Sequence, residues 1–358
     1  KKLKKEIRKK ANKGCTDVVY LDNNATTIIC KEAKKEMMHW VDECYNPSSD
    51  SHVAASARKM LESAQDDILR HCGVSSDTHY ALFTSGATES NCSILRSTCE
   101  AYRKMRGIMP HIVSSVVEHH SILECLEILK DNDMCEYTLV ECSPEGSIKP
   151  ALIVEAIKPN TCLISIMYAN NELGTINNIY AIGAIAHEHQ IPMHTDAVQA
   201  FGKFRMQMDY NNIDAVSASL HKLHGPRGIG LLILSKKLVE GYKLQPMIAG
   251  TQQHGMRGGT ENIPAIAGAN FAIKQVFKHR EVKNKKMWER RMKIIESLSN
   301  VWNRQQYKDF LSNVNQPPDA PRKMLEKPGK PIFVVLGPGE EEKTRYLPNT
   351  LLIAFVNP

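Results

Sequence analysis

The chain has 358 residues, of which 42% are hydrophobic and 24% are charged, as expected of a globular protein with one large or two ordinary domains. Its formal net charge of +7 is concentrated in residues 1–13, which hold eight Lys or Arg and one Glu, so the remainder is neutral. This distribution argues against a nucleic-acid partner, because such partners require a spread basic surface. No apolar run reaches the roughly 18 residues that a membrane span requires, and we expect no membrane partner.

The cysteine pattern and the N-terminus bear on the compartment. Ten cysteines occur, none of them in a C-x-x-C pair, which argues against zinc knuckles and a thioredoxin motif. Their irregular spacing predicts reduced thiols. The opening run KKLKKEIRKK is basic but lacks the apolar core of a signal peptide. These features predict a cytoplasmic protein with a solvated, frayed N-terminus.

The first predicted elements are short and separated by turn-forming residues. Residues 18–21 form an apolar run with the composition of a strand, stopped by Asx and Thr residues. Residues 51–72 have the periodicity of an amphipathic helix. Residues 80–83 predict a strand, after which a Ser-Gly turn leads into a helix. That helix start either binds a phosphate through its free N–H groups or is capped by Ser85 or Thr88, and the sequence leaves both readings open.

Short apolar strands alternate with helices from about residue 80 to residue 235. The later strands are predicted at 111–117, 162–168, 191–195 and 213–220, and the helices between them at 122–129, 151–158 and 179–189. Such alternation is typical of an α/β fold with a mostly parallel sheet covered by helices on both faces. In these folds ligands bind beyond the carboxyl ends of the strands.

Polar residues gather after the predicted strands, which indicates a single site at that edge of the sheet. Lys222 follows the 213–220 strand and precedes a glycine-rich run. Burial at such a position lowers the pKa of a lysine and makes it a nucleophilic amine. A lysine in a glycine-rich loop is more often simply solvated, so its assignment depends on the other strand ends. The strand-end residues are Thr88, His119, Asn171, Asp196, Gln199 and Lys222.

The C-terminal part has a different pattern. A glycine-rich loop at 256–262 precedes predicted helices at 263–277 and 283–298. Residues 315–345 hold six prolines and are predicted to be irregular or mobile. Residues 347–355 predict a final strand.

The strand-end side chains suit pyridoxal phosphate. The buried lysine can form a Schiff base with it, and an acid such as Asp196 keeps its pyridine nitrogen protonated. A flat ring needs a stacking partner, for which His119 is the candidate. The helix start at Ala87 and Thr88 offers N–H and hydroxyl donors to the phosphate.

Two rival sites are weaker candidates. The run GPRGIG at 225–230 matches neither the P-loop nor the Rossmann fingerprint. His187 and His189 point apart across a helix end, so together with His194 they are more readily surface or core histidines than a metal site.

Nine motifs between residues 21 and 351 identify a resemblance. Through them the sequence resembles the cysteine desulfurases of the NifS/IscS type, which are class-V, fold-type I pyridoxal-phosphate enzymes. The motifs occur in family order: LDNNATT (21–27), NPSSDSH (46–52), TSGATESN (84–91), EHHS (118–121), NNELGT (170–175), HTDAVQAFGK (194–203), SLHKLHGPRGIG (219–230), GMRGGTEN (255–262) and LPNTL (347–351).

The resemblance implies a role for each matching residue. Lys222 would be the Schiff-base lysine and proton shuttle, Asp196 would pair with the pyridine nitrogen, and His119 would stack on the ring. Asn171 and Gln199 would contact the ring hydroxyl, with Asn171 also near the substrate carboxylate. The phosphate would be held by Ala87, Thr88, Ser219 and His221, and by Thr260 of the other subunit.

The resemblance also implies the organisation and partners. A large cofactor-binding domain at 31–262 would contain a mostly parallel, seven-stranded sheet. A smaller α+β domain at 263–358 would pack with an N-terminal segment at 1–30. We expect a homodimer with shared sites, L-cysteine as substrate, and a sulfur-acceptor or iron–sulfur scaffold protein as partner. The Cys- and Met-rich composition suggests a divergent viral member, which would act in the host cytoplasm.

Two family groups are missing from the sequence as given. In the family, a loop after the LPNTL strand carries the cysteine that attacks the substrate sulfur, and an arginine further on binds the substrate carboxylate. No cysteine follows Cys162 here. Two alternatives to a desulfurase therefore stay open, namely a selenocysteine lyase-type activity and a cofactor-binding scaffold dimer without turnover.

Overall fold

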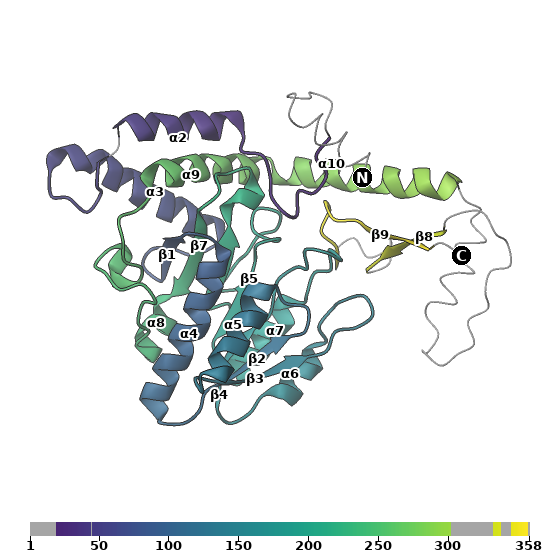
Figure 1. Ribbon diagram of the computed structural model, residues 1–358, viewed down its shortest axis with the longest axis horizontal. Coiled ribbons are helices and arrows are strands. Elements are labelled where there is room, and N and C mark those ends of the chain that lie inside the picture. The colour runs from purple at the N-terminus through teal and green to yellow at the C-terminus, as the bar shows by residue number, and fades with distance from the viewer. Residues whose placement is uncertain (1–18, 44, 302–331, 338–344, 357–358) are drawn as a thin grey trace, which may run out of the picture.

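A seven-stranded sheet forms the centre of the computed structural model, which describes residues 19–43, 45–301, 332–337 and 345–356 (Figure 1). Its strand order is β1-β7-β6-β5-β4-β2-β3. Neighbouring strands are parallel except at β7, which runs antiparallel to both β1 and β6. The strands are β1 (His79–Thr84), β2 (His111–Ser115), β3 (Glu136–Val140), β4 (Thr161–Ser165), β5 (Met193–Asp196), β6 (Ala215–Ser219) and β7 (Gly230–Ser235).

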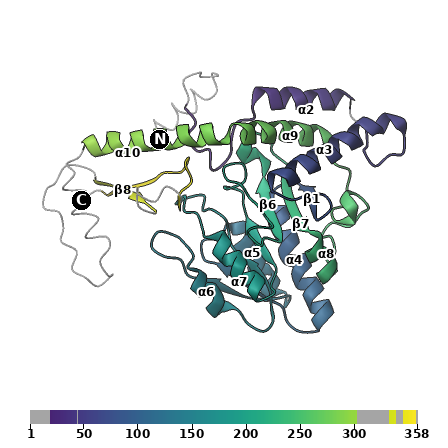
Figure 2. The ribbon, with the colours of Figure 1, turned by 180° about the vertical axis from the view of Figure 1, so that it is seen from behind.

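The helices cover both faces of this sheet (Figures 1 and 2). The helices in the described part of the chain are α2 (Lys31–Glu43), α3 (Ala55–His71), α4 (Ala87–Arg106), α5 (His120–Asp131), α6 (Pro150–Ala156), α7 (Ile179–Glu188), α8 (Lys236–Tyr242), α9 (Ile263–Lys278) and α10 (Arg280–Val301). Of these, α2 packs against α9 rather than on the sheet, and α10 extends beyond it (Figure 1). The predicted α/β fold with a mostly parallel, helix-covered sheet is confirmed.

Alternate residues of the strands feed two separate apolar cores. In β7, Leu231 and Ile233 join the core that contains residues of α3, α6, α7 and α9. Leu232 and Leu234 join the core that contains residues of α4, α5 and α8. Every residue of β7 is therefore buried, which is why this strand reads as a continuous apolar run in the sequence rather than as an alternation.

The last part of the chain returns to the loop that follows β4. A two-stranded antiparallel hairpin of β8 (Ile332–Leu336) and β9 (Leu352–Val356) lies beside α10 (Figures 1 and 2). Before β9, Leu347 N donates to Gly174 O at 2.7 Å, which fastens the segment beside the loop that follows β4. Gly174 has φ +78°, and a Cβ there would lie 2.9 Å from Thr350 Cβ, so a side chain would push the segment away.

Three expectations about local structure are wrong. Residues 19–21 pair with no strand of either sheet, and Val19 and Leu21 are 78% and 80% exposed. β8 falls inside the stretch predicted to be irregular, because that prediction gave more weight to the surrounding prolines than to the apolar run IFVVL. The final strand begins only at Leu352, after a turn. The basic segment 1–13 and most of 315–345 lie outside the described residues.

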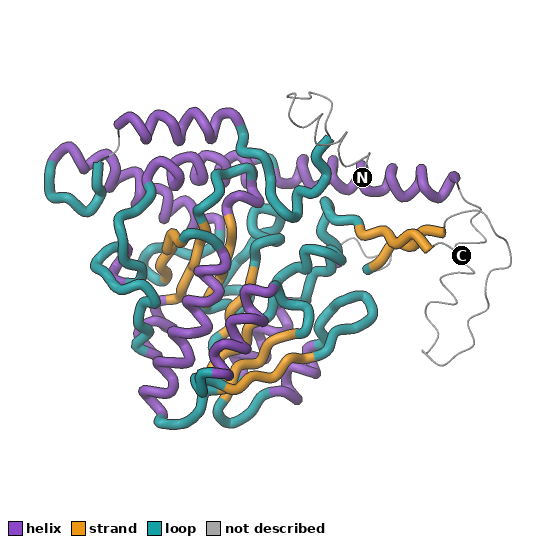
Figure 3. Tube along the Cα trace, viewed as in Figure 1, coloured by secondary structure: helices purple, strands orange, loops and turns teal. Residues whose placement is uncertain are grey.

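Loops collect between the sheet and the layer that contains α9 (Figure 3). The helix α9 packs against α2 and α3 and contributes Ile266 and Ile273 to the first core. The proposed domain boundary at residue 262 stays a prediction. No helix in the described ranges is both long and apolar enough for a bilayer crossing.

Candidate active site

A cavity of about 990 Å³ opens at the carboxyl ends of the parallel strands. It contains both the end of β5, at Asp196, and the turn after β6, at Lys222. Nine of the ten residues singled out from the sequence line it: Ala87, Thr88, His119, Asn171, Asp196, Gln199, Ser219, His221 and Lys222. Thr260 does not line this cavity and is exposed.

Asp196 presents a buried carboxylate to the cavity. Its Oδ1 accepts from Val198 N at 2.9 Å, and its Oδ2 accepts from Asn91 Nδ2 at 2.8 Å. Burial raises the pKa of Asp196, whereas these two donors and the positive charge of Lys222 act in the opposite direction. A carboxylate in this setting is suited to face a cationic group inside the cavity.

A hydrogen-bond chain connects His119 to the same carboxylate. The Asn91 amide also donates to Ser121 Oγ at 2.9 Å, and Ser121 Oγ lies 2.9 Å from His119 Nδ1. Because Ser121 N donates to His119 Nδ1 at 3.1 Å, that nitrogen is an acceptor and the imidazole is neutral, with its proton on Nε2. His119 also precedes α5 as its N-cap, so the helix start fixes the ring orientation.

Lys222 lies in a short 3₁₀ turn, Leu220–Leu223, directly after β6. Its Nζ donates to the carbonyl of Asn24 and, at 2.8 Å, to the carbonyl of Ala25. Burial lowers the pKa of Lys222, and the carboxylates of Asp196 and Asp22 partly oppose that shift. Burial therefore favours the neutral, nucleophilic amine.

The segment before α2 runs across the Lys222 turn. Thr27 N and Oγ1 both donate to His221 O, at 3.0 and 2.7 Å, and Thr27 Oγ1 accepts from His224 N at 2.8 Å. Thr26 Oγ1 shares a hydrogen bond of 2.9 Å with His221 Nδ1. These contacts join residues nearly 200 positions apart and hold the lysine turn against the sheet edge.

Asn24 connects three walls of the cavity. Its Nδ2 donates to Asn171 O and to Thr350 Oγ1, both at 2.8 Å. Its Oδ1 accepts from Asn349 Nδ2 at 2.7 Å. The N-terminal segment, the loop after β4 and the segment before β9 therefore meet at this one side chain.

The start of α4 provides a cradle for an anion. Its N-cap, Gly86, has an extended backbone and makes no side-chain cap, which leaves the N–H groups of the first turn open to a ligand. Neither Ser85 nor Thr88 caps the helix, which favours phosphate binding over capping at this turn. Gly230 packs directly behind it, and a Cβ there would lie 2.6 Å from Gly86 Cα, so only glycine allows this approach.

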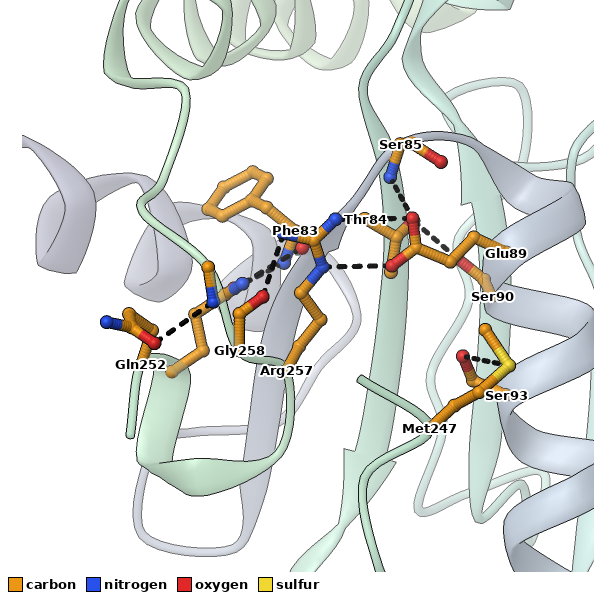
Figure 4. Close-up of polar contacts among 12 residues, drawn as sticks. Phe83, Thr84, Ser85, Glu89, Ser90, Ser93, Met247, Gln252, Arg257 and Gly258 are labelled. Carbon is orange, nitrogen blue, oxygen red and sulfur yellow. Dashed lines mark hydrogen bonds and ion pairs between the residues drawn. The ribbon is translucent and has the colours of Figure 1, made fainter. Parts of the chain in front are cut away.

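A second loop is fastened to the same turn. The Glu89 carboxylate accepts from Ser85 N at 2.8 Å and from Arg257 Nε at 2.9 Å (Figure 4). Gln253 completes the attachment by pairing with both the N–H and the carbonyl of Phe83 in β1, at 2.6 and 2.9 Å. The loop that bears Thr260 is thus held beside the cradle from outside the cavity.

Glu118 is a buried carboxyl next to His119. Its Oε1 accepts from Ser115 Oγ at 2.6 Å and from Met167 N at 2.8 Å, while the structure shows no partner for Oε2. Burial raises its pKa to about 8, with a further contribution from the negative charge of Asp196. Glu118 is therefore protonated at neutral pH and ties the end of β2 to the end of β4.

Comparisons with known proteins agree with this geometry. The profile of the aminotransferase class-V family matches residues 19–315. A cysteine desulfurase IscS of Dictyoglomus turgidum is 39% identical over 257 residues, 71% of this chain and 63% of that protein. A cysteine desulfurase IscS of Methanosarcina thermophila is 36% identical over 285 residues, 79% of this chain and 68% of that protein. The chain belongs to the cysteine desulfurase group of the class-V aminotransferases.

Solved structures of this class-V group are similar as well. A NifS-like protein has a TM-score of 0.78 and 29% identity, with 94% of this chain and 81% of that chain covered. SspA in complex with cysteine has a TM-score of 0.67 and 35% identity, with 72% of each chain covered. The sequence-based resemblance to NifS/IscS-type proteins is confirmed.

The cavity of this class-V chain fits pyridoxal phosphate, the cofactor that the family implies. The uncapped start of α4 suits a phosphate, and the carboxylate of Asp196 suits a protonated ring nitrogen. Lys222 supplies an amine of lowered pKa inside the same cavity. The rival histidine site does not form, because His194 is buried between Ser165 Oγ and Ser217 Oγ while His187 is exposed on α7.

Several residues of this site had no role assigned from the sequence. They are Asn24, Asn91, Glu118, Ser121, Lys203, Asn349 and Thr350. All of them lie inside the nine sequence motifs. Membership of a motif could therefore have identified them, although position directly after a strand did not. Their partners are remote in sequence, and no local pattern indicates them.

Proposed function

We propose that this class-V protein is a pyridoxal-phosphate-dependent cysteine desulfurase. It converts L-cysteine and a protein thiol into L-alanine and a persulfide on that thiol. The observation that carries the proposal is that Lys222, Asp196 and His119 converge in one cavity with an uncapped helix start. The names of the relatives, and the complex of SspA with cysteine, support the choice of substrate.

The cavity residues divide into three groups in this proposal. Asp196 would meet the ring nitrogen, and His119 would lie against the ring. Asn171 and Gln199 would contact the ring hydroxyl, with Asn171 also near the substrate carboxylate. The phosphate would be held by Ala87, Thr88, Ser219 and His221.

Lys222 Nζ is the base of the proposed reaction. Pyridoxal phosphate, when bound, supplies an electron sink that stabilises negative charge at the amino acid Cα. Lys222 takes the Cα proton and later returns a proton to the product. The lowered pKa of Lys222 supports this role, because only the neutral amine accepts a proton. The carbonyls of Asn24 and Ala25 hold the amine at the cavity wall.

We also propose that the protein works as a homodimer with shared sites. Thr260 is exposed outside its own cavity, on a loop fastened by Arg257 to Glu89, which supports a contact with the phosphate of the other subunit. A sulfur-acceptor or iron–sulfur scaffold protein would take up the persulfide sulfur in the cytoplasm.

The first experiment is a visible absorption spectrum of the purified protein with pyridoxal phosphate, before and after L-cysteine is added. We expect a cofactor band that shifts with L-cysteine and does not shift with D-cysteine. A band insensitive to L-cysteine contradicts the choice of substrate. The absence of any band contradicts cofactor binding and favours a scaffold dimer.

Replacement of the lysine tests the covalent attachment. We expect Lys222→Ala to lose the cofactor that borohydride reduction fixes to the wild-type chain, because no other amine takes its place at this position. Intact-protein mass spectrometry after reduction measures the adduct. A Lys222→Ala chain that keeps the adduct excludes Lys222 as the attachment point. The exposed Lys35→Met variant is the matched control and should keep it.

A further inference from the structure

Lys203 lies in the turn after β5, and its side chain is directed back toward the cavity wall. Its Nζ donates to Gln199 O at 2.7 Å and to Gln199 Oε1 at 3.3 Å. Neither partner is a carboxylate. Its backbone is held independently, because Asn284 Nδ2 of α10 donates to Lys203 O at 2.8 Å. The function proposed above gives this lysine no role.

The contact with Oε1 decides how the Gln199 amide is oriented. An ammonium group has donors and no acceptor, so it must face the oxygen of the amide and not the nitrogen. The Nε2 end of Gln199 then points the other way, where it donates to Asn24 O at 3.1 Å. Gln199 lines the cavity, so its remaining N–H is available to an acceptor there.

Burial removes water from the Lys203 amine and so disfavours its protonated form. Burial lowers the pKa of Lys203 to about 7, and the positive charge of Lys222 adds to this shift as long as that amine is protonated. Lys222 from the turn after β6 is the charged group that acts on Lys203 directly, and Asp196 of β5 and Asp22 of the N-terminal segment act on Lys222. A neutral amine accepts hydrogen bonds as well as donating them, so it no longer selects one amide orientation.

We infer that Lys203 is a positioning residue whose protonated form orients the Gln199 amide toward a hydrogen-bond acceptor on the ligand in the cavity. This inference rests on the proposed function, because it takes the acceptor to be the ring hydroxyl of the cofactor. It goes further by making the orientation of Gln199 dependent on the Lys203 proton. Ligand binding should therefore weaken as the pH rises through neutrality.

Pyridoxamine 5′-phosphate is a suitable probe, because it cannot form a covalent link with Lys222. Its dissociation constant is measured by fluorescence titration of the cofactor-free protein at several pH values. We expect Lys203→Met to bind it about tenfold more weakly than wild type at a pH below 7 and to lose the neutral-pH transition. Lys203→Arg keeps its charge throughout, so it should bind tightly and also lose the transition.

A double-mutant cycle separates orientation of Gln199 from a general structural effect. Gln199→Leu should weaken binding about as much as Lys203→Met, and the double variant should be no weaker than either. Lys35→Met, exposed on α2, is the matched control for loss of a lysine charge. Thermal unfolding of each variant checks that the fold is kept.

Two results would overturn this inference without affecting the proposed function. One is a Lys203→Met variant with wild-type affinity and an unchanged pH profile, and the other is additive losses in the double variant. In both cases the probe still binds the wild-type protein, and the proposed function stands. If the probe fails to bind wild type, the proposed function falls and this inference falls with it.

Discussion

Single side chains around the cavity differ in how burial changes their protonation. Glu118 is 6% exposed and protonated at neutral pH, whereas Asp196, also buried, has two hydrogen-bond donors and the nearby positive charge of Lys222, which favour its charged form. The two carboxyls therefore have separate tasks. Glu118 joins strand ends as a neutral acid, and Asp196 supplies negative charge to the cavity.

Glu118 should make stability depend on pH. Its pKa is raised from 4.5 to about 8 in the folded chain, so the folded state holds a proton that the unfolded state has lost between these values. Its contribution to stability is full below about pH 4.5 and is lost as the pH rises through 8. The wild-type free energy of unfolding should fall by up to about 1.4 kcal/mol per pH unit relative to Glu118→Gln.

Urea unfolding at several pH values in this window measures the difference. Glu62→Gln, an exposed change on α3, is the control and should run parallel to wild type. Parallel curves for wild type and Glu118→Gln would show that Glu118 is already ionised at neutral pH, contrary to this assignment.

Cys92, on α4, should be more reactive than Cys72, which follows α3. A hydrogen bond from the Cys125 thiol is the main cause that lowers the pKa of Cys92 to about 7, while burial acts against it and Arg96 assists. Cys72 is buried, and burial raises its pKa. Since the thiolate is the nucleophile, N-ethylmaleimide at pH 7 should label Cys92 well before Cys72.

Peptide mass spectrometry over a time course measures this labelling. Cys125→Ala removes the thiol donor and should slow the reaction of Cys92. Equal rates at Cys92 and Cys72, or an unchanged rate in the variant, contradict the prediction.

Segments remote in sequence come together as one layer over the lysine turn. Residues 24–30 lie across the turn that bears Lys222, and the segment before β9 contacts Asn24 from the other side. The uncapped start of α4 forms another wall, and the loop fastened by Arg257 holds that turn from outside the cavity. The cavity therefore depends on segments that have no regular structure of their own.

Thr27 attaches the N-terminal segment to the lysine turn through three hydrogen bonds. Thr27→Val keeps the shape but removes a donor to His221 O and an acceptor for His224 N, in a residue that is 6% exposed. We expect a loss of about 1–3 kcal/mol in the free energy of unfolding. Hydrogen exchange should also become faster in residues 26–30 and 220–224.

Urea unfolding and peptide-level hydrogen exchange measure these two effects. Thr251→Val, at an exposed position, is the control and should change neither. Protection that is unchanged in both peptides would show that packing, and not Thr27, holds the segment.

Two copies of the chain should combine their residues in each site. In the proposed homodimer, a Lys222→Ala chain would lack the amine but would supply Thr260 to its partner, and a Thr260→Ala chain would keep the amine. Co-refolded heterodimers then contain one site with both native residues. We expect them to recover about half of the covalently fixed cofactor of wild type under conditions where neither variant alone retains it.

Intact-protein mass spectrometry after borohydride reduction assigns the recovered adduct to the Thr260→Ala chain. Light scattering of the wild-type protein gives the oligomeric state. If heterodimers bind no more cofactor than the Thr260→Ala homodimer, Thr260 does not act across an interface.

The periodicity of the sequence was enough to predict the α/β class and most of the elements. Apolar runs with no alternation, such as 162–168, indicate strands covered on both faces, and polar residues placed directly after them indicate a ligand site. These are local signals, because burial and backbone propensity act on neighbouring residues. The same signals misplaced residues 18–21 and missed the strands β3, β7 and β8 and the helices α2 and α8.

The tertiary structure alone decided how the cavity is closed and which charges meet in it. Asn24 and Asn349 are 325 positions apart yet share a hydrogen bond, and Lys222 donates to carbonyls almost 200 positions away. Lys203 and Glu118 acquire their altered pKa values from burial and from charges brought close by folding. Distances between remote residues set these interactions, and no periodicity in the sequence records such distances.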